Sequence, residues 1–230
     1  MASSPTTEKV IPYALLGMTA VTGLVDAVSF LSLGRVFTAN MTGNVVILAF
    51  ATARVPGLSI VRSLTALLAF LVGAILGGRI MARAGVDSQI RFAARAFVLE
   101  VVFLSVASFC SIGYRSDLLE HSFQPFALIA LTALAMGTRN AAVRKLAIPD
   151  LTTTVLTLTI TGIGADSSLA NGNNPRLARR VASVAAMFLG AALGAVIIRY
   201  SISAALWLGT AISALCSAAL FRSLRTSGQL

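Results

Sequence analysis

The chain has 230 residues, of which 57% are hydrophobic and 11% are charged, and its formal net charge is +10. A soluble domain has about 25% charged residues, so this composition excludes a soluble globular protein and indicates an integral membrane protein in a lipid bilayer. No basic run with interleaved aromatic residues lies outside the apolar segments, so nucleic acid is not an expected partner. We expect one membrane domain over residues 1–230.

The first apolar run extends from Ile11 to Leu33, after an N-terminal segment without the basic region of a signal peptide. We expect residues 1–9 to form a short cytoplasmic tail. Polar residues of this run fall at spacings of three and four, so they share one helical face that should point to the protein interior. They are Thr19, Thr22, Asp26 and Ser29. A carboxylate in hydrocarbon has to be paired, protonated or close to water, which makes Asp26 a candidate proton or cation relay, with a structural hydrogen bond as the alternative.

A polar segment of Thr, Asn and Gly residues, Val36–Asn44, opens the second apolar run, Val36–Ala53. We call this segment the first island. Its amides, hydroxyl groups and open backbone suit the binding of a small polar ligand or an ion, whereas helix capping and helix–helix hydrogen bonds are the structural alternative. The candidate binding residues of the first island are Asn40, Thr42 and Asn44.

The third run is Ile60–Ala82 and the fourth is Ala93–Tyr114, which contains Glu100. Glu100 is a possible second carboxylate of the site, although Arg95 lies close enough along the same helix to pair with it.

The fifth run, Pro125–Val143, contains Arg139 and Asn140, and the sixth run is Leu151–Ala165. Arg139 could pair with Asp26 or hold an anionic substrate, or its head group could reach the membrane interface. Thr residues crowd the start of the sixth run, and we call residues 150–157 the second island. Hydroxyl bonds to the helix backbone are the structural alternative for these Thr residues. The candidate binding residues here are Arg139, Asn140, Thr153 and Thr157.

The seventh run is Val181–Tyr200 and the last is Ile202–Phe221. The third and seventh runs each contain a GxxxG motif, which allows two helices to approach closely. The motifs are Gly73/Gly77 and Gly190/Gly194. Residues 125–222 repeat features of residues 11–114 in the same order, which predicts two pseudo-repeats. The matched pairs include Gly23 with Gly137, Asp26 with Asn140, Thr42 with Thr157, and Gly73 with Gly190.

The distribution of Lys and Arg bears on the number of crossings. If all eight apolar runs span the membrane, the basic residues divide nine to nine, and no orientation follows. If the second and sixth runs enter the membrane and return to the side from which they came, thirteen of the eighteen basic residues lie on the side of the termini. The positive-inside rule therefore favours an all-α protein with six full transmembrane helices, two short re-entrant or half-membrane helices, an inverted repeat and both termini in the cytoplasm. Eight spans are the alternative.

Enzyme chemistry has no clear signature in this sequence. There is no Ser/His/Asp set, metal-ligand spacing or Gly-rich phosphate loop, so we expect no catalytic activity, no metal and no cofactor. Cys110 and Cys216 lie inside apolar runs, where packing is their expected role.

Two separated motifs cover the islands and the helices that precede them. The first is Gly23-x-x-Asp26-Ala27 followed by Phe37-x-x-Asn40-Met41-Thr42-Gly43-Asn44, and the second is Gly137-x-x-Asn140-Ala141-x-x-Arg144 followed by residues 152–157. Together they resemble the YoaK-like family of uncharacterised bacterial multi-pass membrane proteins. The chain departs from the family pattern at Thr138-Arg139, where Gln more often precedes the Asn, and at Leu158, where Gly is usual. The resemblance implies a location in the bacterial inner membrane and no established activity.

These observations lead to two functional hypotheses. The first is a secondary transporter or permease for a small solute or ion, with Asp26 as the coupling group. The alternative is a non-transporting scaffold or a membrane-embedded enzyme. A cavity that reaches both islands would favour transport, whereas islands buried dry against each other would favour a scaffold. The sequence leaves the substrate and homo-oligomerisation open.

Overall fold

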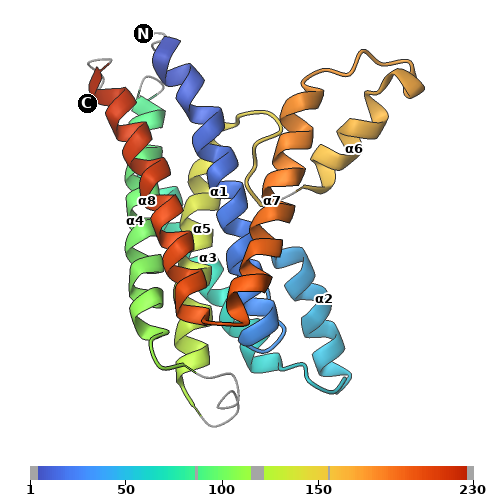
Figure 1. Ribbon diagram of the computed structural model, residues 1–230, viewed down its shortest axis with the longest axis vertical. Helices are drawn as coiled ribbons and strands as arrows, with labels where there is room; N and C mark the ends of the chain where they lie inside the picture. The colour runs from blue at the N-terminus through green and yellow to red at the C-terminus, as the bar shows by residue number, and fades with distance from the viewer. Residues whose placement is uncertain (1–4, 86–87, 115–121, 155, 227–230) are drawn as a thin grey trace.

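The computed structural model describes residues 5–85, 88–114, 122–154 and 156–226, with only the backbone for residues 5–9, and these residues contain helices and no β-strand (Figure 1). The elements in chain order are α1 (Pro5–Ser32), α2 (Met41–Thr52), α3 (Ile60–Ala82), α4 (Gln89–Cys110), α5 (Gln124–Leu146), α6 (Thr157–Ala165), the 3-10 helix η3 (Ser168–Ala170), α7 (Leu177–Ile198) and α8 (Ile202–Thr226).

Six of these helices are long and apolar enough to cross a membrane: α1, α3, α4, α5, α7 and α8. In contrast, α2 has 12 residues and α6 has 9. At a rise of 1.5 Å per residue these two helices are about 18 Å and about 14 Å long, well short of the roughly 30 Å of a hydrocarbon core. The prediction of six full crossings and two short helices is confirmed, and the eight-span alternative is not.

Helix boundaries differ from the apolar runs at three places. The second and sixth runs begin well before α2 and α6, because most of each island is non-helical. The first helix begins at Pro5, so the segment expected to be a tail is in part the first turns of α1. Residues 1–4 lie outside the described part of the chain, as do Arg115 and the rest of the loop to residue 121.

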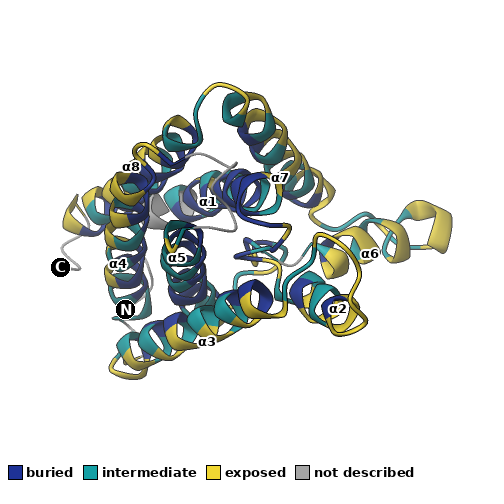
Figure 2. Ribbon diagram, turned by 90° about the horizontal axis from the view of Figure 1, so that it is seen from below, coloured by how far each residue is buried: buried dark blue, intermediate teal, exposed yellow. Residues whose placement is uncertain are grey.

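The helices α1 and α5 occupy the centre of the bundle (Figure 2). In the membrane-spanning part of α1, 67% of the residues are buried inside the protein, and in that of α5, 61% are. The corresponding share for α7 is 17%. The main partners of α1 are α7 and α8, and those of α5 are α3 and α4; α4 and α8 also pack together. The short helices α2 and α6 rest on α3 and α7. Figure 1 shows α6 toward the end of the bundle where both termini lie, and α2 toward the other end.

Glycine residues mark the closest helix crossings. Gly23 of α1 faces Gly190 of α7, and Gly137 of α5 faces Gly73 of α3; a Cβ atom on any of the four would overlap a backbone carbonyl group of the facing helix. The other glycine of each GxxxG motif also contacts the facing helix. The predicted close packing of both motifs is therefore confirmed, since only a residue without a side chain leaves room for these contacts.

The polar face predicted for α1 does point inward. Thr19, Thr22 and Ser29 are fully buried, and Asp26 is half-buried. The three hydroxyl groups all donate to backbone carbonyl groups of α1 itself. Two residues of this face also bond to other segments of the chain: Asp26 accepts from Thr38 and Ala39, and the Thr22 hydroxyl accepts from Arg139.

Candidate functional site

The carboxylate of Asp26 ties the first island to α1. Its Oδ1 accepts hydrogen bonds from the backbone N–H groups of Thr38 and Ala39, each at 2.9 Å. Asp26 lies nearly two turns before the end of α1, so the chain has returned by about 9 Å toward the centre of the bundle at the island. The non-helical part of the first island, residues 36–40, therefore lies beside α1 within the bundle, and α2 starts from that level.

The two Asn residues of the first island have different surroundings. Asn44 is fully buried, where its Oδ1 accepts from the backbone N–H of Phe37 at 2.8 Å and its Nδ2 donates to the carbonyl of the same residue. Asn40 is exposed and caps α2, since its Oδ1 accepts from the N–H of Gly43 at 3.3 Å. Asn44 thus satisfies backbone groups of the island, whereas Asn40 is accessible.

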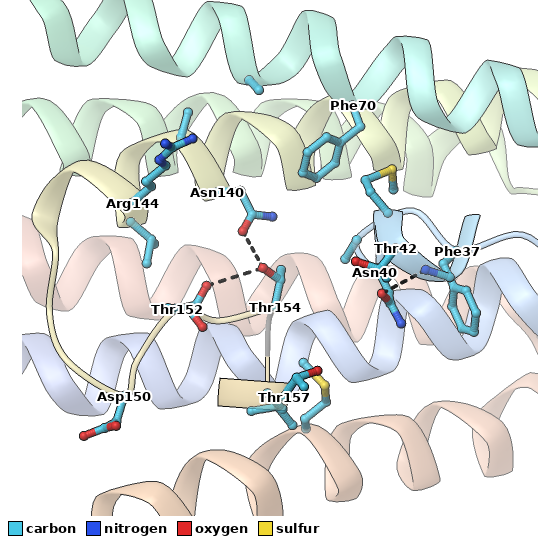
Figure 3. A pocket seen from close by; sticks show the side chains of 18 of the residues that line it. Phe37, Asn40, Thr42, Phe70, Asn140, Arg144, Asp150, Thr152, Thr154 and Thr157 are labelled. Carbon is cyan, nitrogen blue, oxygen red and sulfur yellow. Dashed lines mark hydrogen bonds between the residues drawn. The ribbon is translucent and has the colours of Figure 1, made fainter. Parts of the chain in front are cut away.

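Asn140 ties the second island to α5, as Asp26 ties the first island to α1. Its Oδ1 accepts from the hydroxyl of Thr154 (Figure 3), and its Nδ2 donates to the Met136 carbonyl at 3.0 Å. Asn140 also lies nearly two turns before the end of its helix, α5, so this island too returns into the bundle. The buried Thr153 has φ +62, a left-handed conformation that β-branched residues rarely adopt.

A cavity of about 1750 Å³ lies between the two islands. Its walls come from α1, α2, α3, α5, α6 and α7, and most of its lining is apolar, with residues such as Phe30, Ile47, Phe70 and Met187. Four of the predicted site residues line this cavity: Asn40, Thr42, Asn140 and Thr157. The other predicted site residues are not part of its lining: Asp26, Asn44, Glu100, Arg139 and Thr153.

Three charged residues of the cavity lining were not among the predicted site residues: Arg144, Lys145 and Asp150. Asp150 binds Arg176 at 2.7 Å and Arg180 at 3.0 Å. Although burial acts to raise the pKa of Asp150, the hydrogen bonds from these two arginines outweigh it and the pKa is lowered. The sequence did contain a signal for Arg144, which closes the second family motif, but a basic residue at a helix end is also what the positive-inside rule predicts.

A buried ion pair lies on the side of α5 away from the cavity. Arg139 Nη1 lies 3.0 Å from Glu100 Oε1, and both side chains are fully buried. Arg139 also donates to the Met18 carbonyl and the Thr22 hydroxyl of α1. Two expectations are therefore corrected: Arg139 pairs with Glu100 instead of Asp26, because it points toward α4, and Glu100 pairs with Arg139 instead of Arg95.

Arg95 lies over the Phe92 ring, with its guanidinium carbon 4.7 Å from the ring centroid. Within the described part of the chain, no three His, Cys, Asp or Glu side chains come together as a metal site would require.

Comparison with known proteins assigns the chain to a family. The model of the family described as "Protein of unknown function (DUF1275)" matches residues 14–219. The chain is 37% identical over 155 residues to the UPF0700 transmembrane protein YoaK of Bacillus subtilis (strain 168), and the match covers 67% of this chain. It spans 65% of the relative, just under two thirds of that protein's length. No solved structure matches the chain. The chain belongs to the DUF1275 family, which confirms the resemblance to YoaK-like membrane proteins.

Proposed function

We propose that this member of the DUF1275 family is a secondary transporter or permease for a small solute, with the cavity between the islands as its binding site. The observation that carries the proposal is that one cavity is lined by residues of both islands. Non-helical backbone is tolerated within a membrane where it is buried in protein or lines a cavity. Secondary transporters often bind their substrates at interrupted helices of this kind.

The packing of the helices supports an inverted duplication. If α1 to α4 are exchanged with α5 to α8 in order, each main contact becomes another contact of the same bundle: α1 with α7 becomes α5 with α3, and α1 with α8 becomes α5 with α4. The short helices α2 and α6 exchange in the same way and lie toward opposite ends (Figure 1). Inverted repeats allow a protein to open the same site to either side of the membrane.

The proposed coupling group is Asp26. Its carboxylate forms no ion pair within the described residues, and it holds the backbone of Ala39, which lines the cavity. A change in charge at Asp26 therefore acts directly on a hydrogen bond of the cavity wall. Such a change can alter the balance between two conformations only if one of them binds the proton or ion more tightly.

The same proposal includes a bacterial inner-membrane location with both termini in the cytoplasm, and no enzymatic activity. The orientation is supported by the clustering of basic residues on the side of the termini. The alternative, a scaffold without transport, would not need a cavity that joins the two islands.

Uptake by proteoliposomes tests this proposal. The purified protein is reconstituted with a pH-sensitive dye inside the vesicles, and a panel of anions, cations and neutral solutes is added outside. Gly78 lines the cavity and has no atom within 4 Å of an added Cβ, so Gly78→Trp should obstruct part of the cavity while leaving the helix packing intact. Flux in the wild type that is lost in folded Gly78→Trp supports transport. Absence of flux for every solute favours a scaffold, and equal flux in both proteins would show that the cavity is not the transport site.

A further inference from the structure

We infer that the cavity binds an organic anion with an apolar body, and that Arg144 and Lys145 hold its anionic group. This inference rests on the proposed function, because it names the class of solute for the same cavity. It is carried by the distribution of charge and apolar surface over the lining.

The positive charges of the lining are available to a ligand. Arg144 and Lys145 are exposed, and neither forms an ion pair or a hydrogen bond with any described residue. Both line the cavity from the last turn of α5, and Figure 3 shows Arg144 on the same helix as Asn140, one turn further along. An unpaired guanidinium can bind a carboxylate or a phosphate through two parallel hydrogen bonds.

The negative charge of the lining is already neutralised. Among the described lining residues, Asp150 is the acidic one. Arg176 binds one of its carboxylate oxygens and Arg180 binds the other. A cationic ligand would have to compete with these two arginines. The cavity is therefore electropositive, and it selects against cations.

The lining of the cavity offers hydroxyl donors and apolar walls. Thr42 lies in the first turn of α2 and Thr157 begins α6, and neither hydroxyl group has a hydrogen-bond partner among the described residues. Phe30, Phe37 and Phe70 belong to the surrounding apolar wall. A sugar or another solute that is polar on all sides would lose hydrogen bonds to water against this wall, whereas an anion with a hydrocarbon body would bury apolar surface there.

A free organic acid and the phosphate of an anionic lipid would present the same chemistry to Arg144 and Lys145. We commit to the free acid, because Thr42 and Thr157 line the cavity and a long acyl chain that filled it would cover their hydroxyl groups without offering a hydrogen bond. The two sources differ in whether a soluble ligand without a glycerolipid backbone is sufficient for binding.

Thermal melting of the full chain in neutral detergent tests the inference. The probes are hexanoate, hexanamide and hexylamine, which share a hydrocarbon body and differ in charge, and phosphatidylglycerol added to the micelles. A ligand that binds the folded state raises the melting temperature, and the rise grows with the ratio of ligand concentration to Kd. We expect hexanoate to raise it, and the neutral and cationic analogues to have no effect at the same concentration.

Charge-matched variants assign the effect to the cavity. Arg144→Gln/Lys145→Gln should weaken hexanoate binding by about tenfold or more, as expected for the loss of charge-assisted hydrogen bonds. Arg79→Gln/Arg83→Gln removes the same charge outside the cavity lining and should leave binding unchanged. Equal weakening in both variants, or equal binding of hexylamine or hexanamide, would overturn the inference.

Stabilisation by phosphatidylglycerol but not by hexanoate would also overturn it, in favour of a lipid site. The outcome is independent of the uptake experiment. Hexanoate binding that depends on Arg144 and Lys145 in a protein without flux would retain the anion site and remove the transport function. Flux of cations or neutral solutes, without anion binding, would retain the transport function and remove the anion site.

Discussion

At the scale of single residues, Asp26 and Asn140 perform the same structural task with different chemistry. Each lies inside a central helix and accepts a hydrogen bond from the island that returns beside it. An amide is sufficient for this task in α5, so the carboxylate in α1 is not required for it. The additional property of Asp26 is that it can bind and release a proton or an ion.

The variant Asp26→Asn separates these two properties. An Asn Oδ1 can still accept from the N–H groups of Thr38 and Ala39, so we expect the variant to fold and melt near the wild-type temperature. Because it cannot titrate, it should lose ion-coupled uptake in proteoliposomes. Asp26→Ala is the matched control, since it removes the acceptor as well and should lower the melting temperature. Full coupled uptake by Asp26→Asn would assign Asp26 a structural role only.

The buried pair of Glu100 and Arg139 gives a second prediction at this scale. Removing one partner of a buried ion pair leaves an uncompensated charge and typically costs about 3–5 kcal/mol. We therefore expect Glu100→Gln to lower the melting temperature strongly. The double variant Glu100→Gln/Arg139→Gln should recover part of the loss, because neither charge remains. Additive losses in this double-mutant cycle would show that the pair does not interact as described.

The sequence predicted some members of the site and missed others for physical reasons. Asn40 and Asn140 stand out as amides in apolar surroundings, and both were predicted to belong to the site. Arg144 could not be distinguished from an ordinary basic residue at a helix end, because its role depends on a cavity that only the packing creates. The partner of Arg139 could not be predicted either, since Glu100 lies on another helix.

At the scale of elements, hydropathy located every apolar run but misplaced the starts of α2 and α6. Both helices begin inside their islands, where the backbone turns back toward the centre of the bundle, and hydropathy contains no information on that reversal. Helical spacing did identify the glycine faces correctly, because close packing requires small residues at fixed intervals.

Adjacent glycines of α3 provide a test of the packing. Gly77 contacts the carbonyl of Thr138 in α5, whereas an added Cβ at Gly78 has no atom within 4 Å. We expect Gly77→Leu to force α3 and α5 apart and to lower the melting temperature in detergent by many degrees. Gly78→Leu should melt close to the wild type. Similar melting of the two variants would show that the α3 face is not packed as described.

At the scale of the whole molecule, α1 begins and α8 ends at the same end of the bundle, and the two short helices lie toward opposite ends (Figure 1). This arrangement follows from six crossings of the membrane and from two islands that each return toward the side from which the chain came. It was predictable from the distribution of basic residues, whereas the pairing of α1 with α7 and of α5 with α3 was not, since packing partners leave little trace in one sequence.

Cysteine labelling in intact cells tests the orientation. In a Cys110→Ser background, Ser59→Cys introduces a thiol before α3 and Asn171→Cys introduces one between α6 and α7. A maleimide that does not cross the inner membrane should label the first position and not the second, if both termini are cytoplasmic. Labelling of the second position alone would reverse the orientation. Labelling of both would contradict the return of the second island.

The packing of α1 against α7 and α8 also has a consequence for folding during synthesis. Ribosomes extend a chain from its N-terminus at about 5–20 residues per second, so α1 is made on the order of ten seconds before the helices on which it packs. Throughout that interval its glycine surface has no final partner. The earliest helix of this protein therefore depends on a temporary host, such as the insertion machinery. A chain whose synthesis stops before α7 exposes the features by which quality control could recognise it as unfinished.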